Sequence, residues 1–482
     1  MRFKNREASD WLSPVLVKEM RQGLKGKAFV AVFLIMHGAM LASMAFALAQ
    51  PTPMHMAQTS TGLFWTMTVL SVLVLSPGLG LNALNSEMKA KTFELMILSR
   101  LSAWRIVSGK WSCVVAQAAL IASSLLPYLV VRYFLGGVNL LLELVILAAL
   151  LCASAVLIAM TVFASTYDNQ LARLVMLTIL GATMVMGIGL GASLGRPGAG
   201  PMSSMGGRWP WMALLVIMAA GVALLIFILH AAATRVAPPA ENHAAYKRGV
   251  AVFLLGVALV PVPHDFQEGL LGVLVPVLLL VCIDGCGERI SSTASTYLPY
   301  AGLRGGVGAL AMGLYPGWPS ALVFSALSSI AVAGLFALWT SLSVASAIVM
   351  ALSMFATIVV PTAVARAFRR PAFVGFFALG LHGVLVLGSL LSIEIMELLG
   401  PSLPRDLGPA LVPVAALVQA ASGELDSNLY GVSAVAMALW SLFAGLVLWW
   451  RAAADVRTMV AAERTARHQA KAQRAQGRAT SP

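Results

Sequence analysis

The chain has few charged residues: Asp, Glu, Lys and Arg make up only 11% of its 482 residues, whereas hydrophobic residues make up 59%. A soluble globular protein carries about a quarter of its residues as charges, so this composition and a mean hydropathy of +0.87 exclude that class. Four cysteines are too few for a secreted protein of this length that disulfide bonds would stabilise. The same figures exclude a disordered chain and a collagen. The composition therefore predicts an integral membrane protein.

Nucleotide-binding motifs are also missing. A Walker-type loop requires Gly-Lys followed by Ser or Thr, but Lys110 is followed by Trp111 and Lys27 by Ala28. The stretch 306–311 imitates a dinucleotide fingerprint, yet no strand precedes it, so we interpret it as a cytoplasmic loop. We therefore expect no enzyme activity, no catalytic residue and no cofactor in this chain.

Ionisable and metal-ligating residues are rare inside the apolar runs. His37 and His382 lie in the middle of such runs, and we expect each to hydrogen-bond a neighbouring helix rather than to relay protons. Cys282 and Cys286 have no second pair and no nearby His, so we interpret them as packing residues rather than a metal site. The other candidates, Glu143, His230, Asp284 and Glu394, lie near the ends of runs. This scarcity argues against a proton-coupled antiporter.

Long apolar runs recur along the whole chain. A helix that crosses the bilayer needs about 20 apolar residues, and hydropathy predicts twelve candidate spans. They lie at residues 28–49, 62–82, 111–131, 140–163, 172–194, 210–231, 250–263, 269–283, 319–339, 343–365, 372–393 and 431–450. The runs 250–263 and 269–283 are short, so they are either tilted helices or a re-entrant pair, and the chain enters and leaves them on one side. The fold class is all-α: a polytopic helical membrane protein with about 12 transmembrane helices in two six-helix halves.

Basic residues are distributed asymmetrically across these spans. With the N-terminus in the cytoplasm, 28 of the 32 Lys and Arg residues fall on the cytoplasmic side, and only Arg132, Arg196, Arg208 and Arg405 fall outside. The positive-inside rule therefore predicts that both termini are cytoplasmic. This topology accounts for the net charge of +13, so we expect the lipid bilayer, and no nucleic acid, as a partner.

These patterns divide the chain into segments. We expect a cytoplasmic tail with an amphipathic helix at 1–27, a six-span unit at 28–235 and a cytoplasmic linker at 236–249. A second membrane half follows at 250–450, and a basic cytoplasmic tail at 451–482. No obvious sequence repeat relates the two halves.

The first segment predicts a short amphipathic helix ahead of the first span. Ser13 suits the N-cap and Pro14 the first helical position. The apolar residues Val17, Met20 and Leu24 share one face, and the basic residues Lys18, Arg21 and Lys25 share another. Such a helix should lie in the inner membrane interface. The alternative is a solvated flank of the first span.

A second organised segment, at residues 83–110, joins the second and third spans. Thr92 can cap a short helix with Glu94 in its first turn, where a carboxylate suits the helix dipole. Ser102 can cap a second helix, which leads through Ile106 into the third span. A helix-turn-helix of mixed charge with exposed apolar residues is typical of a docking surface for a soluble partner. The alternative is a loop that rests on the membrane surface.

These two segments resemble the permease subunits of export-type ATP-binding cassette (ABC) transporters. Members of that family show Pro-x-x-x-Lys-Glu ahead of the first span, as Pro14, Lys18 and Glu19 do here. After the second span they show Ser-Glu-x-x-x-Gly-Thr-x-Glu-x-Leu, running on to Ser-x-x-x-Ile-x-x-Gly-Lys. This chain matches at Ser86, Glu87, Thr92, Glu94, Leu95, Ser102, Ile106, Gly109 and Lys110, and departs at Lys91 and Arg100.

The resemblance covers about residues 10–235 and implies roles for both segments. The first would be an elbow helix with Pro14, Lys18, Glu19 and Arg21 as its site residues. The second would hold a coupling helix that seats in a groove of a separate ATPase subunit. The coupling residues are then Glu87, Thr92, Glu94, Leu95, Arg100, Ser102, Arg105 and Lys110. The chain would be the transport subunit in a bacterial inner membrane, as a homodimer or as a heterodimer with another permease.

The second half has no equivalent signature. Its cytoplasmic segment between Asp284 and Pro319 ends in Tyr315-Pro-Gly-Trp318, which is more simply an interfacial anchor than a second coupling helix. Two other functions stay open. One is an ion-coupled secondary carrier, which only the span count favours, and the other is a membrane scaffold or assembly factor without transport.

Overall fold

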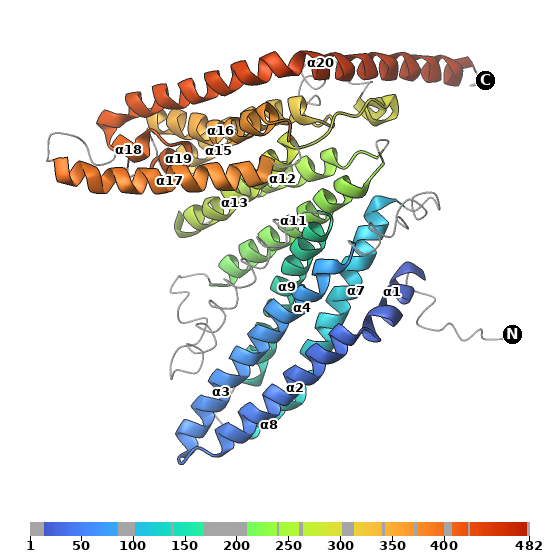
Figure 1. Ribbon diagram of the computed structural model, residues 1–482, viewed down its shortest axis with the longest axis vertical. Helices are drawn as coiled ribbons and strands as arrows, with labels where there is room; N and C mark the ends of the chain where they lie inside the picture. Colours follow the sequence, from blue (N-terminus) through green and yellow to red (C-terminus); the bar gives the residue numbers. More distant parts are fainter. Residues whose placement is uncertain are drawn as a thin grey trace. The chain divides into compact units, whose positions relative to one another are not determined.

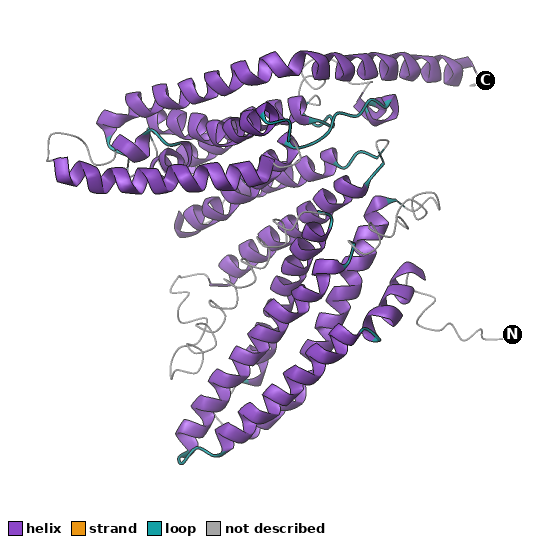
Figure 2. Ribbon diagram, in the orientation of Figure 1, coloured by secondary structure: helices purple, strands orange, loops and turns teal. Residues whose placement is uncertain are grey.

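The computed structural model describes residues 14–84, 102–135, 139–167, 210–238, 241–259, 264–300, 313–339, 343–370, 374–399, 407–422 and 425–479. Every regular element within these ranges is a helix, and none of them is a strand, which confirms the all-α class (Figure 2). Eight helical stretches in these ranges are long and apolar enough to cross a membrane. The chain forms two compact units, Met1–Pro238 and Pro239–Pro482.

The first unit is built from helices that pack along their lengths (Figure 1). These are α1 (Pro14–Leu24), α2 (Lys27–Leu48), α3 (Pro53–Val69), α7 (Ala103–Ser124), α8 (Leu126–Leu135), α9 (Leu140–Ser165) and α11 (Pro210–Val236). The α3 helix continues through a π-helical turn at Leu70–Leu75, α4 (Ser76–Gly78) and a 3-10 turn at Leu79–Asn82. Together these pieces form the candidate span Met54–Leu81, and α7 with α8 forms the span Ala103–Phe134.

The core of the first unit lies between α2, α3, the α7–α8 helix and α9. Met40, Phe64, Trp65 and Ile121 are buried in it. The other side of α2 is apolar but exposed, at Leu34, Ile35, Leu41 and Phe46. A helix that is apolar all round and buried on one side only is typical of a membrane span that faces lipid.

The second span ends at a fixed point on α9. A Cβ on Gly80 would lie 2.4 Å from Thr161 Oγ1, so only glycine permits this approach. The Leu84 amide then donates to Ser165 Oγ at 3.3 Å. The segment that follows, 85–101, lies outside the described residues.

The second unit is centred on α16. Its helices are α12 (Ala244–Ala258), α13 (His264–Cys286), α15 (Trp318–Trp339), α16 (Val344–Ala367), α17 (Val374–Leu399), α18 (Leu407–Ala410), α19 (Pro413–Ser422) and α20 (Tyr430–Ala479). The α16 helix contacts α13, α15, α17, α19 and α20. The core residues Trp318, Val360, Ala363, Ala444 and Leu448 join α15, α16 and α20.

The α12 and α13 helices form a hairpin. Lys247 Nζ, at the start of α12, lies 2.6 Å from Asp284 Oδ2 at the end of α13. The start of α12 and the end of α13 therefore lie at the same end of this helix pair, as the sequence predicts. Residues 236–249 were expected to be a linker, but α12 begins at Ala244 and includes part of that stretch.

The twelve predicted spans correspond only in part to the eight candidates. The run 172–194 lies outside the described residues. The runs 250–263, 269–283 and 372–393 fall on α12, α13 and α17, which are not among the eight. The structure therefore supports a helical, membrane-embedded protein with eight candidate spans in the described part of the chain.

The α20 helix continues far beyond its apolar part. Trp449 and Trp450 are 81% and 78% exposed, whereas Arg457 and Arg464 beyond them are exposed and charged. Tryptophan favours the membrane–water interface, so the apolar part ends near Trp450. Residues 451–479, here called the C-terminal extension, prolong the helix by about 43 Å, past the ends of α15 and α16 (Figure 1).

Candidate functional site

The predicted amphipathic helix is α1, Pro14–Leu24. Lys18, Arg21 and Lys25 are exposed, whereas Val17, Met20 and Leu24 are partly buried, which confirms the two predicted faces. The α1 helix packs on α7. It therefore lies against the span that follows the predicted coupling segment.

An ion pair joins α1 to α7. Lys110 Nζ donates to Glu19 Oε2 at 3.2 Å, and the two side chains are 7% and 14% exposed. The partners come from the two motifs that carry the family resemblance, Lys18-Glu19 and Gly109-Lys110, which lie 91 residues apart. A buried cation is costly unless a carboxylate pairs with it, so this contact fixes the packing of α1 on α7.

Beside this ion pair, α1 and α7 also pack closely against each other. Glu19 and Gly23 lie one turn apart on α1, and Lys110, Cys113 and Gln117 follow one face of α7. A Cβ on Gly23 would lie 2.0 Å from Gln117 Nε2 and 3.3 Å from Cys113 Sγ. We call these five residues the elbow junction.

The downstream end of the coupling segment is held by α7. Ser102 Oγ accepts a hydrogen bond from the Arg105 amide at 3.4 Å, which confirms the predicted cap. In the same turn Trp104 stacks on His230 of α11, with ring centroids 4.1 Å apart and planes 15° apart. The first turns of α7 are thus held by α1 on one side and by α11 on another.

The structure brings only part of the predicted site together. Lys110 and Glu19 meet, whereas Arg105, Lys18 and Arg21 are exposed. Five predicted coupling residues lie outside the described residues, namely Glu87, Thr92, Glu94, Leu95 and Arg100. Pro14 starts α1, as expected for a first helical position.

Sequence reasoning missed a second ion pair in the first unit. Arg132 donates from Nη1 and Nη2 to both oxygens of Glu143, at 2.7 and 2.8 Å. Thr61 Oγ1 accepts from the same guanidinium at 2.9 Å, and the Phe64 ring lies 4.5 Å below it. The available signal was the pair of opposite charges, Arg132 and Glu143, which lie only 11 residues apart near the end of α8 and the start of α9.

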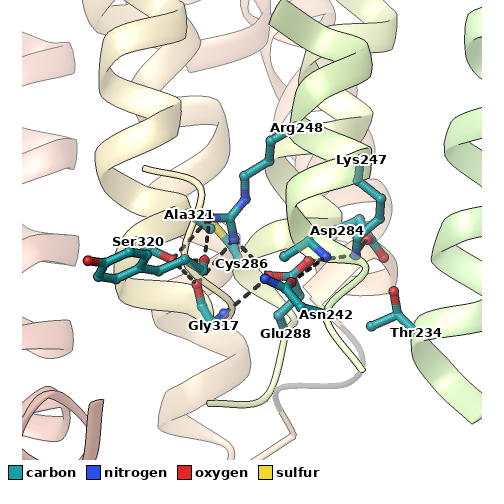
Figure 3. Close-up of polar contacts among 12 residues, drawn as sticks. Thr234, Asn242, Lys247, Arg248, Asp284, Cys286, Glu288, Gly317, Ser320 and Ala321 are labelled. Atoms are coloured by element: carbon teal, nitrogen blue, oxygen red, sulfur yellow. Dashed lines mark hydrogen bonds and ion pairs between the residues drawn. The ribbon is translucent and has the colours of Figure 1, made fainter. Parts of the chain in front are cut away.

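A larger charge cluster lies in the second unit, within the stretch expected to be a linker and at the end of α13 (Figure 3). We call Lys247, Arg248, Asp284 and Glu288 the second-unit charge cluster. Lys247 lies 2.6 Å from both Asp284 Oδ2 and Glu288 Oε1. Arg248 Nη2 donates to Glu288 Oε2 at 2.7 Å. Burial alone would lower the pKa of Lys247, but the two carboxylates outweigh burial and raise it.

Arg248 also holds the loop that leads into α15. Its guanidinium donates to the carbonyl oxygens of Gly313, Tyr315 and Gly317 at 2.6, 2.7 and 3.3 Å. Gly317 has a φ of +113°, and its amide donates to Glu288. A Cβ there would lie 2.9 Å from Ile290 Cγ1, so conformation and space both require glycine.

The aromatic residues of this loop are not an interfacial anchor, and that expectation was wrong. Tyr315 and Trp318 are each only 2% exposed. Trp318 donates from Nε1 to Asp455 of the C-terminal extension at 2.9 Å. Arg366 lies over the Trp318 ring at 4.1 Å. The C-terminal extension and Arg366 therefore cover Trp318, which the sequence predicted to lie at the membrane interface.

Three tyrosines of the loop pack against the C-terminal extension. Tyr297 and Tyr315 form a buried cluster with Ala462 and Ala466, and Tyr300 and Met459 pack at its edge. Tyr315 OH donates to Glu463 Oε1 at 3.1 Å, and Arg467 donates to the same oxygen at 2.6 Å. We call these residues the tyrosine contact. The predicted basic tail is thus a helix that packs on the second unit through one face.

The buried tyrosines should ionise at a higher pH than a solvent-exposed tyrosine. Burial first, and then the charge of Glu463, raises the pKa of Tyr297 from 10.0 to about 12. The folded protein therefore prefers the neutral ring, and this stabilisation is complete below pH 10 and is lost as the pH rises towards 12. The ultraviolet absorbance of tyrosinate measures this titration. A Tyr297→Phe variant should lose part of the late component, and a variant that keeps all of it would contradict the assignment.

The histidines and cysteines within the predicted apolar runs are hydrogen-bonded or buried. His37 Nδ1 lies 3.0 Å from Tyr128 OH, which confirms the expected bond to a neighbouring helix. His382 Nδ1 instead lies 2.8 Å from Ala378 O of its own helix, so that expectation was wrong for His382. Cys282 and Cys286 are buried and free. Within the described ranges, no group of three or more His, Cys, Asp or Glu residues could hold a metal ion.

No known protein family, no characterised protein and no solved structure matches this chain significantly.

Proposed function

We propose that the chain is the membrane-spanning permease subunit of an ATP-driven ABC exporter in a bacterial inner membrane. A separate ATPase subunit docks on the cytoplasmic segment after the second span. The observation that carries the proposal is the Glu19–Lys110 pair, because it joins the two segments that resemble the family. With this function goes a topology of twelve spans with both termini in the cytoplasm.

The elbow junction supports a mechanism for this coupling. ATP binding to the partner moves the coupling segment, and Ser102 links that segment directly to the first turn of α7. The α7 helix is held to α1 by Glu19 and Lys110 and to α11 by the Trp104–His230 stack. A displacement of the segment is thus passed to several helices at once, which rock between inward-open and outward-open states.

Co-purification tests the proposal. Expressed with the products of its neighbouring genes, the chain should bring down an ATPase, and Glu94→Lys should weaken that binding, because it reverses the charge at the predicted coupling helix. Asp426→Lys is a matched control, since Asp426 is exposed and lies on the predicted outer face. The proposal is rejected if no ATPase binds. Transport that survives ATP depletion and stops with an uncoupler would instead establish a secondary carrier.

A further inference from the structure

The second span changes helix type along its length. Its N-terminal part is the α-helix α3, which is followed by the π-helical turn Leu70–Leu75, by α4 and by a 3-10 turn. A π-helical turn inside a longer helix is rare and often marks a functional position. The turn lies just ahead of Pro77, which has no amide hydrogen to donate to the preceding turn. The Ser76 amide donates in the π pattern to Ser71 O. The next acceptor in that pattern, Val72 O, falls to Pro77, which cannot donate.

A neighbouring helix supplies the missing donor. Ser154 Oγ of α9 donates to Val72 O at 2.6 Å, and Ser154 is 0% exposed. A buried carbonyl oxygen that lacks a donor is costly. This hydrogen bond therefore stabilises the π-helical turn and holds it on α9.

The third span is interrupted in the same layer of the core. The α7 helix ends at Ser124 and α8 begins at Leu126, with Pro127 in its first turn. Proline again removes a donor from the helix, which favours a kink at this place. Val72 of the π-helical turn and Leu125 of this interruption are both 0% exposed and belong to one buried cluster. The two neighbouring spans thus have their irregular turns at one level of the first unit.

The parts on either side of this layer pack against different neighbours. On one side α3 contacts α2 and α8, and Arg132 of α8 donates to Thr61 of α3 at 2.9 Å. We call these two helices the α3–α8 group. On the other side α4 contacts α7 and α9, and the Leu84 amide donates to Ser165 Oγ of α9 at 3.3 Å. We call residues 76–84 together with α7 the α4–α7 group. The α9 helix runs unbroken past both groups.

We propose that the second and third spans bend together in this layer, so that the α4–α7 group moves as one body relative to the α3–α8 group, with α9 as the shared axis. The Ser154–Val72 hydrogen bond keeps this hinge in its present conformation, because it holds the π-helical turn on α9. The coupling segment begins and ends in the α4–α7 group, at Leu84 and Ser102. A displacement of that segment would therefore bend both spans at once. The hinge belongs to the chain itself and needs no ATPase.

Hydrogen exchange of the purified chain alone tests the hinge. Ser154→Ala leaves Val72 O without its donor and loosens the π-helical turn. The amides of residues 73–84 and 124–129 should then exchange about tenfold faster, the size of effect expected when local opening is opposed by one hydrogen bond fewer. The amides of residues 54–69 should keep their wild-type rates, because α3 stays in the α3–α8 group.

Ser43→Ala is the matched control. Ser43 is also a buried serine in a membrane-spanning helix, but its Oγ donates to Met40 O of its own helix. This variant should leave exchange at residues 73–84 unchanged. Wild-type rates at residues 73–84 or 124–129 in Ser154→Ala would overturn the inference. Equal acceleration at residues 54–69 would also overturn it, because the second span would then open as a whole.

Pro77→Ala tests the cause of the hinge. Alanine restores the missing amide donor, so Val72 O gains a partner within its own helix and the bond from Ser154 becomes dispensable. In the Pro77→Ala background, Ser154→Ala should therefore change exchange by less than about twofold. A full tenfold effect in that background would overturn the inference. A chain that shows this pattern of exchange but binds no ATPase would reject the proposed function and leave the hinge established.

Discussion

Replacing Arg248 with methionine should destabilise the second unit by about 3–5 kcal/mol, the cost of removing one partner from a buried ion pair. The guanidinium is 2% exposed and donates to Glu288, to Ser320 and to three loop carbonyls. Methionine fills much of the volume of the side chain but offers no donor, so these acceptors lose their bonds while still buried. The loop 313–317 should then separate from α12.

Thermal unfolding of the purified protein in detergent measures this effect, and a fall of about 10 °C in the midpoint is expected for a unit of this size. Arg289→Met is the matched control, because Arg289 lies beside Glu288 in the sequence but is exposed. Arg248→Lys should recover only part of the loss, since an ammonium group cannot reproduce the planar fork of donors. An Arg248→Met protein that unfolds at the wild-type temperature would show that the cluster does not hold the loop.

The features that the sequence predicts well depend on short-range order. The two faces of α1 follow from the spacing of Val17, Met20 and Leu24, and the cap of α7 follows from Ser102 itself. Both need only the helix period and local hydrogen-bonding rules. The all-α class follows from apolar runs of spanning length. In each case the information lies within a few turns of helix.

The features that the sequence does not reveal depend on contacts between distant segments. Glu19 and Lys110 were each named as site residues, but their pairing spans 91 residues. Arg248 was counted as a topology signal, because a basic residue beside a span normally stays in solvent. The C-terminal extension was expected to be a basic cytoplasmic tail, solvated or facing lipid, because its alanine and arginine residues favour a helix without indicating what the helix packs against. Its partner is a tyrosine cluster more than 140 residues away, as the Tyr315–Glu463 bond shows.

A common rule connects the ion pairs of the two units. Only 11% of the residues in this chain are charged. In each ion pair or charge cluster described above, the buried charges lie next to a side chain of opposite charge. The cost of an unpaired charge in an apolar environment is what makes such pairing necessary. The Glu19–Lys110 and Arg132–Glu143 pairs each join two different helices, and the Arg248–Glu288 pair joins α12 to the loop after α13. Each pair therefore selects one packing arrangement among several that apolar surfaces alone would permit. The Glu19–Lys110 pair is the one that lies next to the predicted coupling segment.

Reversing either charge of the Glu19–Lys110 pair should disrupt the elbow junction, and reversing both should restore it. In the wild type, Lys110 Nζ lies 3.2 Å from Glu19 Oε2. Glu19→Lys places two cations at this contact, and Lys110→Glu places two carboxylates there. The double variant regains an attractive pair of the same two groups.

A double-mutant cycle on thermal stability should give a coupling energy of about 2 kcal/mol, and ATPase stimulation by the chain should follow the same order. Gln22→Lys is the control, because it adds a cation at an exposed position of α1. If the double variant is as unstable as the sum of the single variants, the pair does not hold α1 on α7, and the proposed route from coupling segment to spans loses its main support.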